Sequence, residues 1–168
     1  MANVPAAPHV RLRHAGAGDG ADLGRLRFSW RKERNPDEPH DEGEFVDAFR
    51  RWWERHLHSH PAVVAVDGET LVGMAFLAVV DRPPNPGALQ RCHGDLQSMY
   101  IRPEHRGRGT GPRMVAAVLD LARELGCDKV TVHSGHRALP LYQRAGFVAI
   151  DRWLTLDLTE LSGPTEPR

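Results

Sequence analysis

The chain has 168 residues, and its 22 Lys and Arg side chains balance 22 Asp and Glu side chains, so the formal net charge is zero. This length fits one domain with a sizeable core, and the lack of a basic excess argues against a general nucleic-acid-binding protein. The first residues hold no basic segment followed by an apolar one, and the longest apolar run, MAFLAVV, is far too short to cross a bilayer. We therefore expect a cytoplasmic protein that binds neither a membrane nor nucleic acid.

The first 60 residues predict one strand and two helices. Residues 9–15 alternate and predict a strand, which the segment GAGDG ends. Asp19 then stands where it would cap a first helix. Asp41 and Glu44 form a capping pair for a second helix. That second helix carries four aromatic residues at helical spacing: Phe45, Phe49, Trp52 and Trp53.

From residue 62 the pattern changes to strands. The segments AVVAV and TLVGMAFLAVV predict a hairpin with its turn at Asp67 and Gly68. A Pro-rich excursion separates this hairpin from the strand DLQSMYI. A helix follows, with Pro112 in its first turn and Gly126 after its last. The strand KVTVHS, a short helix in ALPLYQRAG and a final strand or pair in FVAIDRWLTLDL complete the chain.

The predicted order is β-α-α-β-β-β-α-β-α-β, which indicates an α/β (α+β) fold with a mixed sheet. No internal repeat or low-complexity linker interrupts it. We expect a single domain over residues 1–168, with an ordered core at 9–158 and flexible ends at 1–8 and 162–168.

Two features that could bind metal have simpler interpretations. Cys92 and Cys127 are too few for a disulfide framework and have no CxxC spacing. The segment HLHSH places three histidines at alternate positions, but it follows a helix and precedes Pro61, where the chain turns. We interpret it as a solvated helix end and expect no metal.

The loop YIRPEHRGRGTGPRM, residues 100–114, joins a strand to a helix and contains four Arg and three Gly. A helix N-terminus offers unpaired N–H groups and a partial positive charge, and glycines let an anion approach the backbone. The loop therefore suits a phosphate or pyrophosphate. It lacks the Gly-Lys-Ser/Thr end of a Walker A loop, and the dinucleotide-binding pattern fails at Pro112. A glycine-rich surface turn with solvated arginines stays open as an alternative.

Two motifs together resemble the GNAT superfamily of acyl-CoA-dependent N-acyltransferases. RGRGTG, residues 106–111, is similar to the family's Gln/Arg-x-x-Gly-x-Gly/Ala pyrophosphate motif, and LYQRAGF, residues 141–147, to its Leu-Tyr-x-x-x-Gly-Phe motif. One helix and one strand separate them, as in the family, and the resemblance is strongest over residues 95–147. It implies a mixed, mostly antiparallel central sheet flanked by helices.

The resemblance also implies a site for acetyl-CoA as cosubstrate. In the family, backbone amides of the motif hold the pyrophosphate, and the preceding strand pairs with the pantetheine arm. Pro112 departs from this pattern chemically because it has no N–H to donate. The amides fall here on Arg106, Gly107, Arg108, Gly109, Thr110 and Gly111, and the strand residues are Met99, Tyr100 and Ile101.

For the chemistry, the resemblance assigns Tyr142 as the general acid that protonates the departing thiolate. A phenol with a pKa near 10 is protonated at neutral pH and suits that role; packing of the short helix is the alternative. Asp95 matches the position of a glutamate that some members use as a base, and it would act through a water that Gln97, on the same strand face, would orient. His93 and His133 are rival bases.

The resulting prediction is an N-acetyltransferase, EC 2.3.1 class, that moves an acetyl group from acetyl-CoA to a primary amine by direct attack in a ternary complex. The acceptor is a small molecule or a peptide, and the sequence is compatible with a homodimer. One alternative is a catalytically inactive acyl-CoA-binding sensor. A nucleic-acid-binding domain is less favoured because no aromatic-basic platform is present.

Overall fold

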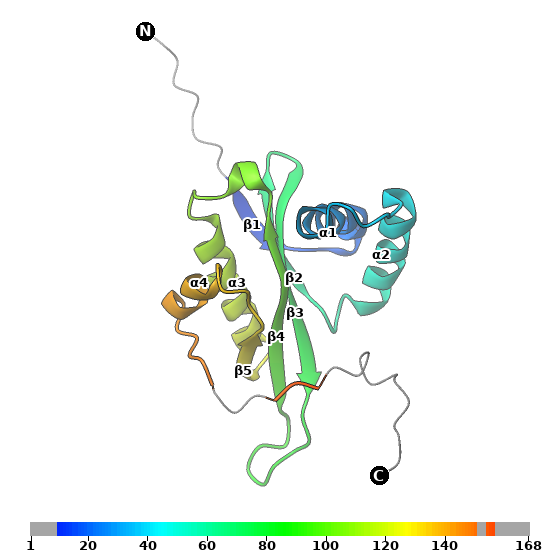
Figure 1. Ribbon diagram of the computed structural model, residues 1–168. Coiled ribbons are helices and arrows are strands. Elements are labelled where there is room, and N and C mark those ends of the chain that lie inside the picture. The colour runs from blue at the N-terminus through cyan, green and yellow to red at the C-terminus, as the bar shows by residue number, and fades with distance from the viewer. Residues whose placement is uncertain (1–9, 151–153, 157–168) are drawn as a thin grey trace, which may run out of the picture.

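The computed structural model describes residues 10–150 and 154–156. A five-stranded sheet in the order β1-β2-β3-β4-β5 forms the centre, with α1 and α2 on one face and α3 and α4 on the other (Figure 1). The strands are β1 (Arg11–His14), β2 (Ala62–Asp67), β3 (Thr70–Asp81), β4 (Cys92–Ile101) and β5 (Cys127–Val132). The helices are α1 (Gly20–Arg34), α2 (Glu42–His56), α3 (Thr110–Glu124) and α4 (Leu139–Arg144), with short 3-10 turns η1 (Ala17–Asp19) and η2 (Pro103–His105).

Neighbouring strands run antiparallel except β4 and β5, which are parallel. The mixed, mostly antiparallel sheet predicted from the sequence is therefore confirmed. Residues 62–66 of β2 and 71–78 of β3 are buried, because helices cover both faces there, and these segments are accordingly almost continuous apolar runs.

The two faces of the sheet carry separate cores. On one face, α3 packs Met114, Val115 and Val118 against the sheet. On the other, Leu23 of α1 and Trp53 of α2 pack beside Phe76 of β3. In the part of the chain that the structure describes, no helix is both long enough and apolar enough to cross a membrane.

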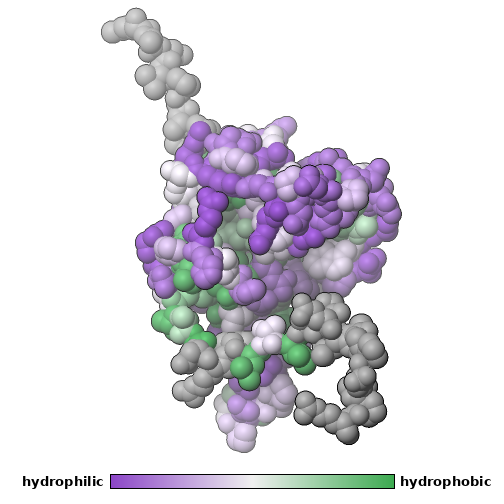
Figure 2. Space-filling view, in the orientation of Figure 1, coloured by the Kyte–Doolittle hydropathy of each residue, from purple (hydrophilic) through white to green (hydrophobic). Residues whose placement is uncertain are grey.

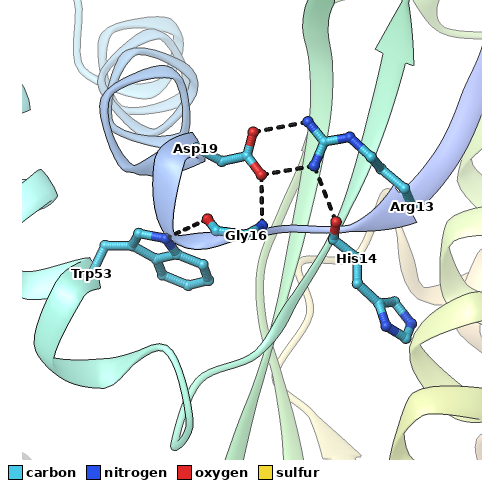
Figure 3. A network of polar contacts seen from close by, with 5 residues as sticks. All are labelled: Arg13, His14, Gly16, Asp19 and Trp53. Carbon is cyan, nitrogen blue, oxygen red and sulfur yellow. Dashed lines mark hydrogen bonds and ion pairs between the residues drawn. The ribbon is translucent and has the colours of Figure 1, made fainter.

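A polar network holds the turn between β1 and α1 (Figure 3). Both terminal guanidinium nitrogens of Arg13 donate to the Asp19 carboxylate, at 2.7 and 2.8 Å, and the Gly16 amide donates to the same carboxylate at 2.7 Å. The hydrogen bond from Arg13 lowers the pKa of Asp19. Asp19 is the N-cap of α1, as predicted, but its side chain makes no capping hydrogen bond to that helix, because this network already occupies its carboxylate. The Trp53 indole donates to Gly16 O at 3.0 Å and so ties α2 to this turn.

The capping pair of the second helix is confirmed, since the Asp41 carboxylate accepts from the Glu44 amide at 2.8 Å. The aromatic residues of α2 form a connected row of ring contacts that runs from Phe28 through Phe45, Phe49 and Trp52 to Phe76. Only Trp53 of the four predicted aromatics is fully buried.

The predicted final strand is not found in the described part of residues 147–158, namely 147–150 and 154–156; the rest of that segment lies outside the described residues. Val148 is 78% exposed and Leu154 is 94% exposed, so these side chains contact little of the core. Alternating apolar residues make a strand only when a sheet edge pairs with them, and β5 has no partner beyond β4 in the described sheet. The surface over α1 and α2 is mostly hydrophilic, whereas hydrophobic residues gather around α4 and the segment after it (Figure 2).

Candidate active site

The loop before α3 leaves the surroundings of Gly107 and Gly109 open, whereas the Arg106 amide already donates to Pro103 O at 3.2 Å. Gly107 and Gly109 adopt left-handed backbone, with φ of 73° and 75°, which side chains other than glycine rarely tolerate. Gly109 is the N-cap of α3, and no side chain of the described residues caps the first turn of that helix. Within the described structure, no atom lies within 4 Å of where a Cβ would stand at either glycine. An anion can therefore approach these amides.

Arg106 is not a solvated side chain of this loop. Its guanidinium makes a two-pronged ion pair with Glu33 of α1, at 2.7 and 2.8 Å, and its Nε donates to Ile101 O at 2.8 Å. Arg106 hydrogen bonds lower the pKa of Glu33, and the Glu33 carboxylate raises the pKa of Arg106. Arg108 remains exposed on the loop. Arg106 thus fixes the loop against α1 and leaves the positive charge to Arg108 and the helix.

A bulge in β4 redirects the strand toward this loop. Ser98 has φ of 51°, and Ser98 and Met99 together stand opposite Ala75 of β3. Leu96 and Tyr100 would share a face of a regular strand, but Leu96 packs in the α3 core and Tyr100 in the α1 core. No sequence signal marked Ser98 as a bulge.

Beyond the bulge, β4 has no parallel neighbour in the described sheet. Pairing between β4 and β5 ends at Leu96 and Val132. Met99, Tyr100 and Ile101 follow that last pair on a strand whose antiparallel neighbour is β3, so their other edge offers main-chain donors and acceptors that β5 does not use.

Tyr142 lies on α4 and is buried in the α3 core, with 5% of its surface exposed. Its hydroxyl lies 3.6 Å from the Met99 sulfur, so α4 brings it against the side chain of a residue that β5 leaves without a partner. Burial raises the pKa of Tyr142, and the phenol therefore keeps its proton at neutral pH.

Asp95 lies on the face of the sheet opposite to Tyr142. Its register partner is Thr131 of β5, and the pairing of β4 with β5 ends one residue pair later. Its carboxylate accepts from Gln97 Nε2 at 2.7 Å and from Thr131 Oγ1 at 3.1 Å. The expectation that Gln97 shares its face is confirmed, and Thr131 is a contact that the sequence did not reveal. Both carboxylate oxygens are held in fixed directions.

Asp95 lines a groove of about 270 Å³ together with residues of β3, β4, β5 and the segment after β3. Burial, followed by the charges of Lys129 and Arg82, lowers the pKa of His93 in this groove, so its imidazole is neutral at pH 7. His133 is exposed and does not line the groove. The lining residues are Val80, Arg82, His93, Gly94, Asp95, Lys129 and Thr131.

A second groove, of about 370 Å³, lies between α3 and α4. It begins at Pro112 beside the loop, and Arg144 of α4 lines it.

The histidine segment HLHSH is not simply a solvated helix end, as its sequence had indicated. The His56 ring stacks on the Trp52 indole, with ring centres 4.7 Å apart, and His60 contacts the same indole at 5.1 Å. The described residues contain no group of three or more His, Cys, Asp or Glu placed to hold a metal ion.

Sequence comparison assigns this arrangement to a known class. Residues 26–147 match the model of the Acetyltransferase (GNAT) family. The chain is 32% identical over 88 residues to glucosamine 6-phosphate N-acetyltransferase of Trypanosoma brucei brucei; the aligned part is 52% of this chain and spans little more than half, 58%, of that enzyme. It is 30% identical over 132 residues to the L-amino acid N-acyltransferase MnaT of Escherichia coli (strain K12), covering 69% of this chain and 74% of that one.

Structure comparison agrees on the fold. A predicted acetyltransferase with acetyl-CoA from Clostridium acetobutylicum superposes with a TM-score of 0.75 at 24% identity, covering 90% of this chain and 97% of the other. Because the family model matches well over half of the residues, the chain belongs to the GNAT acetyltransferase family. Its enzyme class is that of the GNAT N-acetyltransferases, EC 2.3.1.

Proposed function

We propose that this protein transfers an acetyl group from acetyl-CoA to a primary amine, by direct attack of the amine on the thioester in a ternary complex. The observation that best supports this is the open N-terminus of α3, preceded by two glycines with left-handed backbone. Its N–H groups and partial positive charge suit the CoA pyrophosphate. Membership in the GNAT family supports the same donor.

In this proposal the donor lies along the loop and the open edge of β4. The pantetheine arm pairs with the backbone of Met99, Tyr100 and Ile101, which β5 leaves unpaired. The nucleotide end follows the groove between α3 and α4, where Arg144 supplies positive charge. The amides proposed to hold the pyrophosphate are those of Arg106, Gly107, Arg108, Gly109, Thr110 and Gly111. Of these, the Arg106 amide also donates to Pro103 O at 3.2 Å.

Tyr142 is the proposed general acid. The thiolate that leaves when the acetyl group is transferred must gain a proton, and Tyr142 is a buried, protonated phenol beside Met99. A phenol and a thiolate have comparable basicity, so the proton can move toward sulfur as the carbon–sulfur bond breaks.

Asp95 is the proposed base and acts through water. Both of its oxygens already accept hydrogen bonds, from Gln97 and Thr131, and these hold the carboxylate in place at the groove. The amine must lose a proton before its nitrogen can attack the thioester carbon. His93, neutral and in the same groove, is the alternative acceptor of that proton.

The charges of the groove favour an amine that also carries an anionic group. Arg82 and Lys129 outnumber the single carboxylate of Asp95 among the lining residues. The ammonium of the acceptor would face Asp95 and its carboxylate or phosphate would face the two cations. The trypanosome and bacterial relatives are named for a sugar phosphate amine and for amino acids, which fits this preference. We propose a single domain over residues 1–168, with its core at 9–158, acting on such a small-molecule acceptor.

The donor site is tested by calorimetry with acetyl-CoA. Gly109→Val forces a branched side chain into left-handed backbone at the pyrophosphate, and binding should weaken by at least about tenfold, roughly 1.4 kcal/mol. Gly68→Val is the matched control, because Gly68 also has positive φ and open surroundings but lies in the β2–β3 turn. Wild-type affinity in a folded Gly109→Val protein would refute the proposed pyrophosphate site.

The acceptor is tested by following thioester consumption with paired amines, such as an amino acid and its amide, or glucosamine 6-phosphate and glucosamine. The anionic member of each pair should have a kcat/KM at least about tenfold higher, and Arg82→Gln should reduce that ratio. Acetyl-CoA binding without turnover on any amine would instead support the inactive sensor.

A further inference from the structure

The two cysteines meet at the first rung of the parallel pair β4–β5. Cys92 and Cys127 are register partners, and both are half-buried free thiols. Their sulfur atoms lie 3.4 Å apart, and Cys92 Sγ also lies 3.6 Å from Leu125 O at the end of α3. Although 35 positions separate them in sequence, the fold makes them immediate neighbours.

We propose that Cys92 and Cys127 form a dithiol site that hydrogen peroxide oxidises to an intramolecular disulfide, which ties β4 to β5. Adjacent strands lie about 4.8 Å apart, within the range of Cα separations that a disulfide spans, so neither strand has to move far. This inference does not depend on the proposed acetyl transfer.

The chemistry needs only the two thiols and the peroxide. The Cys92 sulfur, as thiolate, attacks one peroxide oxygen and becomes a sulfenic acid, while the other oxygen leaves as hydroxide and takes up a proton to form water. The Cys127 sulfur then attacks the sulfenic sulfur, the sulfur–sulfur bond forms, and the displaced hydroxide takes the second thiol proton as water. Two thiols are oxidised and one peroxide is reduced to two waters.

The surroundings assign the order of the two steps. Burial and the neighbouring Cys92 raise the pKa of Cys127 to about 11, so Cys127 is a poor first nucleophile at neutral pH. A sulfenic acid on Cys92 forms within contact distance of Cys127, and that proximity favours closure over further oxidation.

The experiment treats the purified full-length chain with equimolar hydrogen peroxide and counts thiols by alkylation and intact mass. The expected product has lost two hydrogens and both alkylatable thiols, runs as a single chain without reductant, and returns to the starting mass with dithiothreitol. The cross-link should also raise the midpoint of thermal unfolding by roughly 5 °C or more. Both thiols remaining, linkage between chains, or a midpoint that does not rise would overturn the proposal.

Single variants keep the test decisive. In Cys127→Ser the sulfenic acid on Cys92 cannot be resolved within the chain, and dimedone should label it. In Cys92→Ser, Cys127 should stay a thiol under the same treatment. Equal labelling of both single variants would show two independent thiols and would also overturn the proposal.

Discussion

The two faces of the sheet build their parts of the site by different means. On the α3 face and at the loop before α3, the decisive features belong to the main chain: left-handed glycines, a bulge at Ser98 and a strand edge that β5 leaves open. On the α1 and α2 face, the decisive features are side chains. Trp53 fills the core, and Gln97 and Thr131 hold the Asp95 carboxylate by hydrogen bonds. A main-chain site constrains the residue types along one short segment, whereas a side-chain site draws on residues scattered through the chain.

The largest expected effect tests whether α2 acts through packing. Trp53→Ala removes a fully buried indole and its hydrogen bond to Gly16 O, and should lower the free energy of unfolding by about 3–5 kcal/mol. Urea unfolding measures this loss. Trp52→Ala, at a half-buried position, is the control and should cost less. Equal losses in the two variants would contradict the central role of Trp53 in this core.

Tyr142→Phe tests chemistry on the other face. It keeps the ring in the core and removes the proton, so kcat should fall about 100-fold while acetyl-CoA binding changes little. Tyr100→Phe removes the other tyrosine hydroxyl, which belongs to the α1 core, and should lower kcat much less. Because burial raises the pKa of Tyr142, its phenol should stay protonated throughout the pH range below the ordinary titration of tyrosine. Wild-type kcat should therefore not fall through deprotonation of Tyr142 in that range. An unchanged kcat in Tyr142→Phe, when chemistry limits the rate, would reduce Tyr142 to a packing residue.

The same contrast explains how much the sequence could predict. The loop glycines and Tyr142 lie in two short motifs that can be recognised in the sequence. The glycines are confined to one segment because its backbone must turn and begin a helix there. Glu33 and Thr131 could not be found in this way, since each reaches its partner only after distant segments fold together. Helices with periodic apolar faces were predicted correctly. The last strand was not found in the described part of residues 147–158, because alternation does not supply a pairing partner.

Asp95→Asn tests the groove on the α1 and α2 face. The change is nearly isosteric and removes the negative charge, so kcat/KM at neutral pH should fall about tenfold and recover partly at high pH, where free amine is abundant. Asp128→Asn is the control, because Asp128 pairs with Arg91 outside the groove. If the Asp95→Asn variant kept the wild-type pH–rate profile, Asp95 would not be the base, and His93→Gln would be the next variant to measure.

The smallest effect concerns the ion pair between Arg106 of the loop and Glu33 of α1. Glu33→Gln frees Arg106 from its two-pronged contact, and acetyl-CoA binding should weaken by about two- to fivefold, because half-exposed ion pairs contribute up to about 1 kcal/mol. Arg106→Gln should weaken acetyl-CoA binding by a similar factor. If the two residues act only through their contact with each other, the double variant should bind no more weakly than either single variant.

The pH dependence of this ion pair has a definite sign. Hydrogen bonds from Arg106 lower the pKa of Glu33 in the folded protein. A depressed carboxyl pKa stabilises the fold above the unfolded-state value, about 4.3, and that stability is lost as pH falls through the lower folded value. Wild type should therefore lose stability relative to Glu33→Gln below about pH 4.3, and the two should differ by a constant amount near neutrality. A difference in unfolding free energy that stayed constant down to about pH 3, more than a unit below that unfolded-state value, would show that Arg106 holds the loop without help from the charge on Glu33.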